Sequence, residues 1–185
     1  MSKAKDDFKY NVVVGAPRMG KSTFLAKTAA NYLIRNPHNI VSITETQGTF
    51  PFDLIKKICA EKEVETKDRL FYFRARPEQR DIIDDLPPGL AIIDDTRAIF
   101  SDDKATELYL FAVNHRHIET NVTLVYHSLA KVHYSLIEVI NKIYAFKVLD
   151  SYKKVGRRLP DQVTKEFVEA ANKLEPYKKI ALRLF

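Results

Sequence analysis

The 185-residue sequence lacks the features that mark disulfide-bonded, secreted and membrane-spanning proteins. Cys59 is its single cysteine, which excludes an intrachain disulfide and an all-cysteine metal site and suits a reducing compartment. Its longest apolar stretches, such as residues 108–113, are far shorter than the roughly 20 residues of a transmembrane helix. Residues 1–9 are polar and charged, so no signal peptide is expected. We therefore predict a protein without a membrane span of its own.

The composition is that of an ordinary globular chain, with 45% apolar and 29% charged residues. A chain of this length suits one α/β domain and is short for two, so we predict a single domain over residues 1–185. The net charge of +6 is unevenly distributed, because residues 151–185 contain nine Lys or Arg against four Asp or Glu, a difference of +5. This basic C-terminal segment either contacts phosphates or is an ordinary solvated surface.

Short apolar runs alternate with longer amphipathic stretches, which is typical of βαβ units and of a mainly parallel sheet. The apolar runs predict strands at 10–14, 40–44, 70–73, 90–93, 122–126, 143–149 and 179–185. The amphipathic stretches predict helices at 22–34, 52–61, 105–117, 135–141 and 161–174. We therefore predict an α/β fold in which helices flank a central sheet.

The segment Gly15-Ala-Pro-Arg-Met-Gly20-Lys21-Ser22 matches the P-loop pattern G-x-x-x-x-G-K-[ST] between a predicted strand and a predicted helix. The glycines let the backbone bend so that N–H groups face phosphates, and the helix N-terminus favours negative charge. Lys21 would reach the β and γ phosphates, and the Ser22 hydroxyl would bind a Mg²⁺ ion that bridges phosphate oxygens. The predicted ATP-binding residues are Gly15, Ala16, Pro17, Arg18, Met19, Gly20, Lys21, Ser22 and Thr23.

Two carboxylates, Asp94 and Asp95, follow the apolar run at 90–93. The carboxyl end of a buried strand is where α/β sheets bind their ligands. Asp94 is expected to bind the metal, as in a Walker B strand, and Asp95 to orient or deprotonate the attacking water. Aspartates are also common in solvated turns, which is the simpler alternative, but the P-loop upstream favours catalysis.

Together with these motifs, the segments Asn114-His-Arg-His117 and Val122-Thr-Leu-Val-Tyr-His127-Ser-Leu129 resemble the FtsK/HerA superfamily of DNA-pumping ATPases, in particular viral genome-packaging ATPases. The resemblance covers roughly residues 10–149. It implies a P-loop NTPase core with strand order 5-1-4-3-2, a homo-oligomeric ring and ATP-driven movement of double-stranded DNA. It also implies a location in the host-cell cytoplasm or on the virion, with capsid, portal or membrane proteins as partners.

The resemblance assigns roles to further residues. Arg116 matches an arginine that precedes the fourth core strand and would enter a neighbouring subunit's site as an arginine finger. The simpler alternative for Arg116 is a residue at a helix end that interacts with the terminal carbonyls, and Arg97 is a rival for the finger role. His127 stands where the family usually has Gln and would sense the γ phosphate, although a histidine at a strand end is more often structural. The predicted catalytic residues are Lys21, Asp94, Asp95, Arg116 and His127.

Two basic clusters are the predicted DNA contacts. They would bind the phosphates of duplex DNA without reading its sequence. Aromatic residues lie among them and could stack on bases, but core packing is the better explanation of those side chains. The predicted DNA-binding residues are Arg74, Arg76 and Arg80 in one cluster and Lys153, Lys154, Arg157 and Arg158 in the other.

Two other functions fit the same motifs. In a nucleoside or nucleotide kinase, residues 153–158 would close over the phosphates as a lid and exclude water, whereas the paired aspartates favour hydrolysis. A phage assembly or secretion ATPase would use ATP to switch a protein interface, and its hydrolysis would not respond to DNA. We predict an ATP-hydrolysing motor that moves double-stranded DNA, with viral genome packaging as its expected task.

Overall fold

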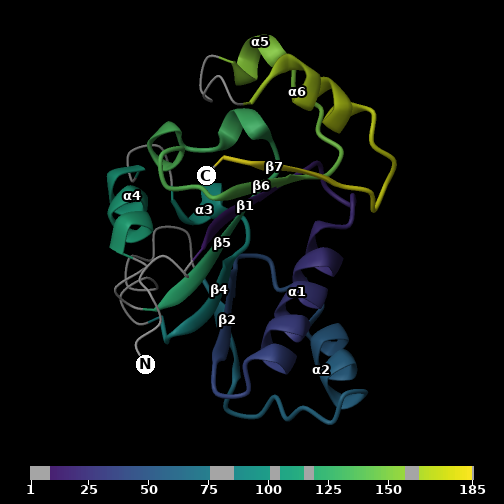
Figure 1. Ribbon diagram of the computed structural model, residues 1–185, viewed down its shortest axis with the longest axis vertical. Coiled ribbons are helices and arrows are strands. Elements are labelled where there is room, and N and C mark those ends of the chain that lie inside the picture. The colour runs from purple at the N-terminus through teal and green to yellow at the C-terminus, as the bar shows by residue number, and fades with distance from the viewer. Residues whose placement is uncertain (1–8, 76–85, 101–104, 115–118, 157–162, 185) are drawn as a thin grey trace.

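The computed structural model describes residues 9–75, 86–100, 105–114, 119–156 and 163–184 (Figure 1). A seven-stranded sheet runs through these residues in the order β3-β2-β4-β5-β1-β6-β7. All neighbouring strands are parallel except β6 and β7, which pair antiparallel. The strands are β1 (Tyr10–Val14), β2 (Ile40–Glu45), β3 (Leu70–Arg74), β4 (Gly89–Ile93), β5 (Thr120–Tyr126), β6 (Lys142–Ala145) and β7 (Ile180–Arg183).

Helices cover both faces of this sheet, and in Figure 1 α1 and α2 lie on one side of it and α4 on the other. Two short 3₁₀ turns, η3 and η4, follow β5 along the chain, and η4 packs against α4. None of the helices in the described part of the chain has both the length and the apolar character needed to cross a bilayer. The helices and turns are α1 (Lys21–Arg35), α2 (Phe52–Ala60), α3 (Thr96–Ile99), α4 (Ala105–Asn114), η3 (Leu129–Lys131), η4 (Tyr134–Leu136), α5 (Tyr152–Val155) and α6 (Lys165–Asn172).

The central strands are apolar on both faces because each face meets its own hydrophobic core. In β1, Val13 packs into the core beneath α1 and α2, whereas Val12 and Val14 pack into the core on the opposite face. This division follows from the alternation of side chains along a strand. Helix α1 contributes Leu25, Ala29 and Leu33, which are spaced four residues apart and form one buried stripe.

The predicted α/β fold and core strand order are confirmed. If β1, β2, β4, β5 and β6 are counted as strands one to five, they stand in the order 5-1-4-3-2, and β3 and β7 extend the sheet at its two edges. The order of the complete sheet differs from the predicted core order only by these edge strands. The fold therefore brings the P-loop, which follows β1, and the two aspartates, which follow β4, to the same edge of the sheet.

The helix predicted at 135–141 is wrong. Those residues contain only the end of the turn η4, because the chain must then enter β6 beside β1. Asn141 makes this join: its backbone N–H donates to Tyr10 O at 2.7 Å, and its side-chain Oδ1 accepts from Tyr10 N at 2.7 Å.

The other differences concern the ends of elements. The strand predicted at 143–149 ends at Ala145, and Lys147 then accepts a hydrogen bond from Ala16 in the P-loop. The helix predicted from residue 161 begins at Lys165, where Thr164 caps it by accepting from Phe167 N at 3.3 Å. The helix predicted at 105–117 is described as far as Asn114. The short helices α3 and α5 were not predicted.

Candidate active site

The segments that follow β1, β2, β4 and β5 converge on a cleft of about 430 Å³ at the carboxyl edge of the sheet. Parallel strands bring their carboxyl ends to one edge, so segments far apart in the sequence meet there. The cleft is lined by Pro17, Arg18, Lys21, Ser22, Glu45, Thr46, Gln47, Thr49, Asp94, Asp95 and His127.

The P-loop is fixed at both of its ends. At its start, Gly15 N donates to Tyr126 O at 3.2 Å and Ala16 N donates to Lys147 O at 2.8 Å. At its end, Gly20 has a φ of 95°, and a Cβ at this position would lie 2.6 Å from Cδ1 of Tyr177. Only glycine fits this backbone conformation and this close approach without displacement.

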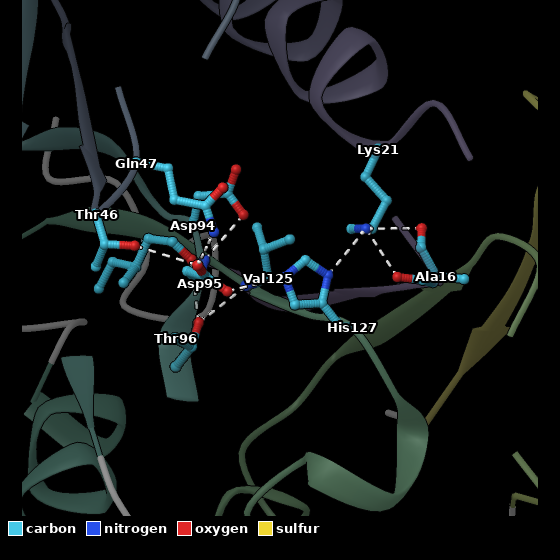
Figure 2. Close-up of polar contacts among 11 residues, drawn as sticks. Ala16, Lys21, Thr46, Gln47, Asp94, Asp95, Thr96, Val125 and His127 are labelled. Atoms are coloured by element: carbon cyan, nitrogen blue, oxygen red, sulfur yellow. Dashed lines mark hydrogen bonds and ion pairs between the residues drawn. The ribbon is translucent and has the colours of Figure 1, made fainter. Parts of the chain in front are cut away.

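Lys21 is buried, and its ammonium group points back into the loop. Its Nζ donates to Gly15 O at 2.7 Å and to Ala16 O at 3.0 Å, and it lies 3.4 Å from His127 Nδ1 (Figure 2). Burial lowers the pKa of Lys21, while the charges of Asp94 and Asp95 raise it. The loop therefore contains a positive charge that its own carbonyls and the two aspartates stabilise.

Asp95 is held by three side chains from two other segments. Its Oδ2 accepts from Thr46 Oγ1 at 3.1 Å and from Gln47 Nε2 at 2.9 Å, and its Oδ1 lies 2.9 Å from His127 Nε2 (Figure 2). A lysine ammonium group can only donate, so His127 accepts from Lys21 through Nδ1 and donates to Asp95 through Nε2. A carboxylate has about four acceptor positions, so Asp95 can accept one further donor, such as a water molecule.

Asp94 lies beside Asp95 at the end of the buried strand β4. Its backbone N donates to Thr44 O at 2.8 Å, and its Oδ1 accepts from Asp95 N at 2.9 Å. Burial raises the pKa of Asp94; the backbone N–H of Asp95 and the charge of Lys21 lower it, and the charges of Asp95 and Glu45 raise it. The cleft therefore concentrates negative charge around this carboxylate.

The oxygen atoms of this cleft suit a hard divalent cation. Asp94 offers a carboxylate and Ser22 a hydroxyl, and both residues line the cleft. Mg²⁺ prefers oxygen ligands, keeps several waters and is commonly bound by one or two carboxylates together with substrate phosphates. Ser22 and Asp94 are therefore the residues that could hold Mg²⁺ here.

Thr96 fixes the two aspartates relative to β5. Its hydroxyl donates to Ile93 O at 3.0 Å and accepts from Val125 N at 3.0 Å (Figure 2). The Thr96 side chain is fully buried, so both bonds are shielded from water. The hydroxyl thereby ties the end of β4 to the strand that carries His127.

The structure brings together the P-loop, Asp94, Asp95 and His127 but not every residue singled out in the sequence. Arg97 lies in α3 with its Nη1 3.4 Å from His133 Nε2, and it does not line the cleft. Arg74 ends the edge strand β3, whereas Lys153 and Lys154 are exposed on α5, which follows β6 near the opposite edge of the sheet. The predicted site residues that lie outside the described ranges are Arg76, Arg80, Arg116, Arg157 and Arg158.

The segment that follows β2 contributes to the site, although no motif in the sequence marks it. Thr46 and Gln47 bind Asp95, and Glu45 orders the same segment by accepting from Thr49 N at 3.1 Å and Phe50 N at 3.0 Å. A signal for them was present, because the order 5-1-4-3-2 places strand 2 beside strand 3. Polar residues at the end of strand 2 must then lie near the carboxylates at the end of strand 3.

No protein-family model and no curated protein sequence matches this chain. The solved structures do contain similar folds. The genome packaging NTPase B204 from Sulfolobus turreted icosahedral virus 2, in complex with AMPPCP, has a TM-score of 0.68 at 12% identity, and the match covers 96% of this chain and 93% of the viral protein. The DNA-packaging ATPase from Sulfolobus turreted icosahedral virus has a TM-score of 0.68 at 12% identity, with 95% of this chain and 92% of the other covered.

A third similar structure comes from a different class of ATPase. The cytoplasmic domain of the type VII secretion ATPase EccC from Thermomonospora curvata has a TM-score of 0.59 at 11% identity, and the match covers 95% of this chain but 25% of the EccC chain. Identities this low establish the fold alone. The chain has the P-loop NTPase fold found in viral genome-packaging and secretion ATPases, consistent with its sequence resemblance to the FtsK/HerA superfamily.

Proposed function

We propose that this chain is a Mg²⁺-dependent ATPase that moves double-stranded DNA, with packaging of a viral genome as its task. The observation that carries the proposal is the convergence of Lys21, Asp94, Asp95 and His127 on one cleft at the carboxyl edge of the sheet. The structural similarity to two viral packaging enzymes supports the same conclusion.

In this proposal the triphosphate of ATP lies along residues 15–22, whose backbone N–H groups and Lys21 bind its oxygens. The site contains one buried lysine, which would bind the negative phosphates, and three carboxylates, Glu45, Asp94 and Asp95. A divalent cation would offset the repulsion between these carboxylates and the phosphates. Ser22 and Asp94 would hold Mg²⁺, which neutralises charge on the transferred phosphoryl group when it is bound. Similar folds have been crystallised with AMPPCP and with ATP-gammaS.

Hydrolysis requires a group that orients or deprotonates water. Asp95 suits this role because three donors fix its carboxylate and leave one acceptor position for water. His127 connects this carboxylate to Lys21, so a shift of Lys21 on nucleotide binding would reach Asp95 through one imidazole ring. Asp95 would thus be the base or water-orienting residue and His127 the sensor.

Movement of DNA would require more than one copy of the chain. A homo-oligomeric ring would let Arg116 complete a neighbour's site, and it would add many weak phosphate contacts around one duplex. The protein would act in the host cytoplasm or on the virion, where capsid, portal or membrane proteins recruit it. The candidate DNA contacts are the exposed residues Arg74, Lys153 and Lys154, together with Arg76, Arg80, Arg157 and Arg158.

Steady-state ATP hydrolysis with and without long duplex DNA tests this proposal. We expect DNA to stimulate hydrolysis and the stimulation to weaken between low and moderate salt, because phosphate contacts release counterions. Lys21→Ala, which removes the phosphate-binding ammonium group, should abolish turnover and provides the background rate.

The alternative functions give different results in the same assay. Hydrolysis that depends on Lys21 but not on DNA would contradict the motor and favour an assembly or secretion ATPase. Negligible hydrolysis, with phosphate transfer to a nucleoside or nucleotide, would contradict hydrolysis altogether and favour a kinase.

A further inference from the structure

The P-loop has an exposed aromatic neighbour that the proposed hydrolysis does not use. Tyr177 lies in the connection between α6 and β7, and 69% of it is exposed. Its Cδ1 is the atom nearest to the position that a Cβ on Gly20 would occupy, at 2.6 Å, so the edge of the ring lies against the end of the loop. The rest of this large aromatic surface is open to solvent.

The backbone around Tyr177 is fixed on the start of α1. Tyr177 N donates to Met19 O at 3.0 Å, and two residues later Lys179 Nζ lies 4.9 Å from the centroid of the Phe24 ring. In Figure 1 the connection between α6 and β7 passes beside the beginning of α1. Tyr177 therefore has a defined position relative to the P-loop.

Tyr177 also has an unfavourable backbone conformation. Its φ is 64°, in the left-handed region where glycine and asparagine are favoured and bulky residues are rare. Backbone conformations of this kind are energetically unfavourable, and they cluster at functional sites. A tyrosine that contributes little buried surface is not what stability alone would favour at this position.

The direction of a bound triphosphate would bring its nucleoside to this side of the loop. The aspartates that would face the γ phosphate follow β4, and β6 and β7 lie on the opposite side of β1 in the sheet order. A triphosphate whose terminal group points toward β4 therefore extends its other end toward the segments that flank β6 and β7. Tyr177, shortly before β7, belongs to that side.

We infer that Tyr177 is the stacking platform for the nucleobase of the bound nucleotide. This inference rests on the proposed function, since it requires a nucleotide on the P-loop. The exposed face of the ring supplies a flat apolar surface that any base can cover. Its anchored backbone would hold that surface in place before the nucleotide binds, which reduces the ordering cost of binding.

Calorimetric titration with ATP and with inorganic tripolyphosphate separates base stacking from phosphate binding. Tyr177→Ala should raise the Kd for ATP by roughly 5- to 150-fold, the range expected for one base on one aromatic ring. Its Kd for tripolyphosphate, which has no base, should stay within about two-fold of wild type, and Tyr177→Phe should bind ATP nearly normally. Tyr134→Ala is the matched control, because Tyr134 is 72% exposed and lies in η4, which packs against α4 on the other side of the sheet from α1.

Three results would overturn the inference. An unchanged Kd for ATP in Tyr177→Ala would show that no base lies on the ring. An equal loss of ATP and tripolyphosphate binding would show that the ring only supports the loop. If the wild-type protein binds neither ATP nor tripolyphosphate, the proposed function is overturned as well, because the tripolyphosphate titration measures phosphate binding without a base.

Discussion

Asp95 has a left-handed backbone conformation, with φ at 57° and ψ at 41°, immediately after the buried strand β4. Apart from glycine, aspartate and asparagine are the residues that tolerate this region best. The conformation lets Asp95 meet Thr46, Gln47 and His127, whereas Asp94 contacts Asp95 N through its own carboxylate. The left-handed conformation of Asp95 thus gives the two adjacent carboxylates different hydrogen-bond partners.

The residues that the P-loop and Walker B patterns name could be predicted from the sequence because each pattern is local. Lys21, Ser22, Asp94 and Asp95 all line the cleft. Gln47 belongs to no local pattern, and its role follows only from the strand order, which makes β2 and β4 neighbours in the sheet. Its bond to Asp95 joins residues 48 positions apart.

His127 provides a test at the scale of one residue. Because it joins Lys21 Nζ to Asp95 Oδ1, His127→Ala should lower kcat on the order of 100-fold, a typical cost of losing one positioned polar group. His127→Gln should retain more activity, since an amide can both donate and accept. Steady-state hydrolysis at saturating ATP measures both variants.

The His127 variants need a control for binding. ATP affinity should change little in either variant, because the P-loop is intact. If His127→Ala hydrolyses ATP as fast as wild type, His127 is a structural residue and not a sensor.

At the scale of elements, the strands were easier to predict than the connections. Strand β4 begins at Gly89, continues through four apolar residues and ends before Asp94, and its five residues are all buried. The end of β6 was misplaced because Phe146 and Val148 are apolar and buried like a strand, although the chain has already left β6 to close the P-loop through Lys147. Local hydrophobicity cannot distinguish these two reasons for burial.

The link between β4 and β5 gives a stability prediction. Thr96→Val keeps the shape of the side chain but leaves the buried Val125 N–H without its acceptor. The free energy of unfolding should fall by about 1–3 kcal/mol, the cost of an unsatisfied buried donor. Chemical denaturation measures this change.

Thr28→Val is the matched control for that substitution. The Thr28 hydroxyl donates to Phe24 O at 2.9 Å within α1, where the helix backbone supplies that carbonyl with a second donor. Loss of the Thr28 hydrogen bond should therefore lower the free energy of unfolding by less than Thr96→Val does. Equal effects of the two substitutions would show that the Thr96 bond does not hold the strands together.

At the scale of the whole molecule, the resemblance predicted the order of the five core strands, and the structure adds one strand at each edge of that core. The basic residues were harder to interpret, because charge in the sequence does not reveal where side chains lie on the surface. Arg74 ends β3 at one edge, and α5 with Lys153 and Lys154 follows β6 near the other. In the proposed motor, Arg74 and the two lysines of α5 would therefore contact different parts of a duplex, or different subunits of the ring would present them.

The basic side chains of α5 can be tested by the salt dependence of DNA binding. The double variant Lys153→Gln, Lys154→Gln should weaken duplex DNA binding, and the slope of log K against log salt should become less steep by about 0.9 for each phosphate that the two lysines neutralise in the wild-type protein. Fluorescence anisotropy across a salt series measures both quantities. Lys165→Gln is the control, because Lys165 already pairs with Glu169 at 3.6 Å. An unchanged slope in the double variant would exclude α5 from the DNA-binding surface.

The most direct test of the proposed active site is ATP hydrolysis by Asp95→Asn, with ATP binding measured on the same protein. Asparagine tolerates the left-handed backbone and keeps the size of the side chain, but it cannot accept a proton as a carboxylate does. We predict near-normal ATP binding and a fall in turnover of roughly 100- to 10,000-fold, the usual contribution of a positioned acid or base. Wild-type turnover in Asp95→Asn would contradict the assignment of Asp95 as the hydrolytic residue and with it the proposed site.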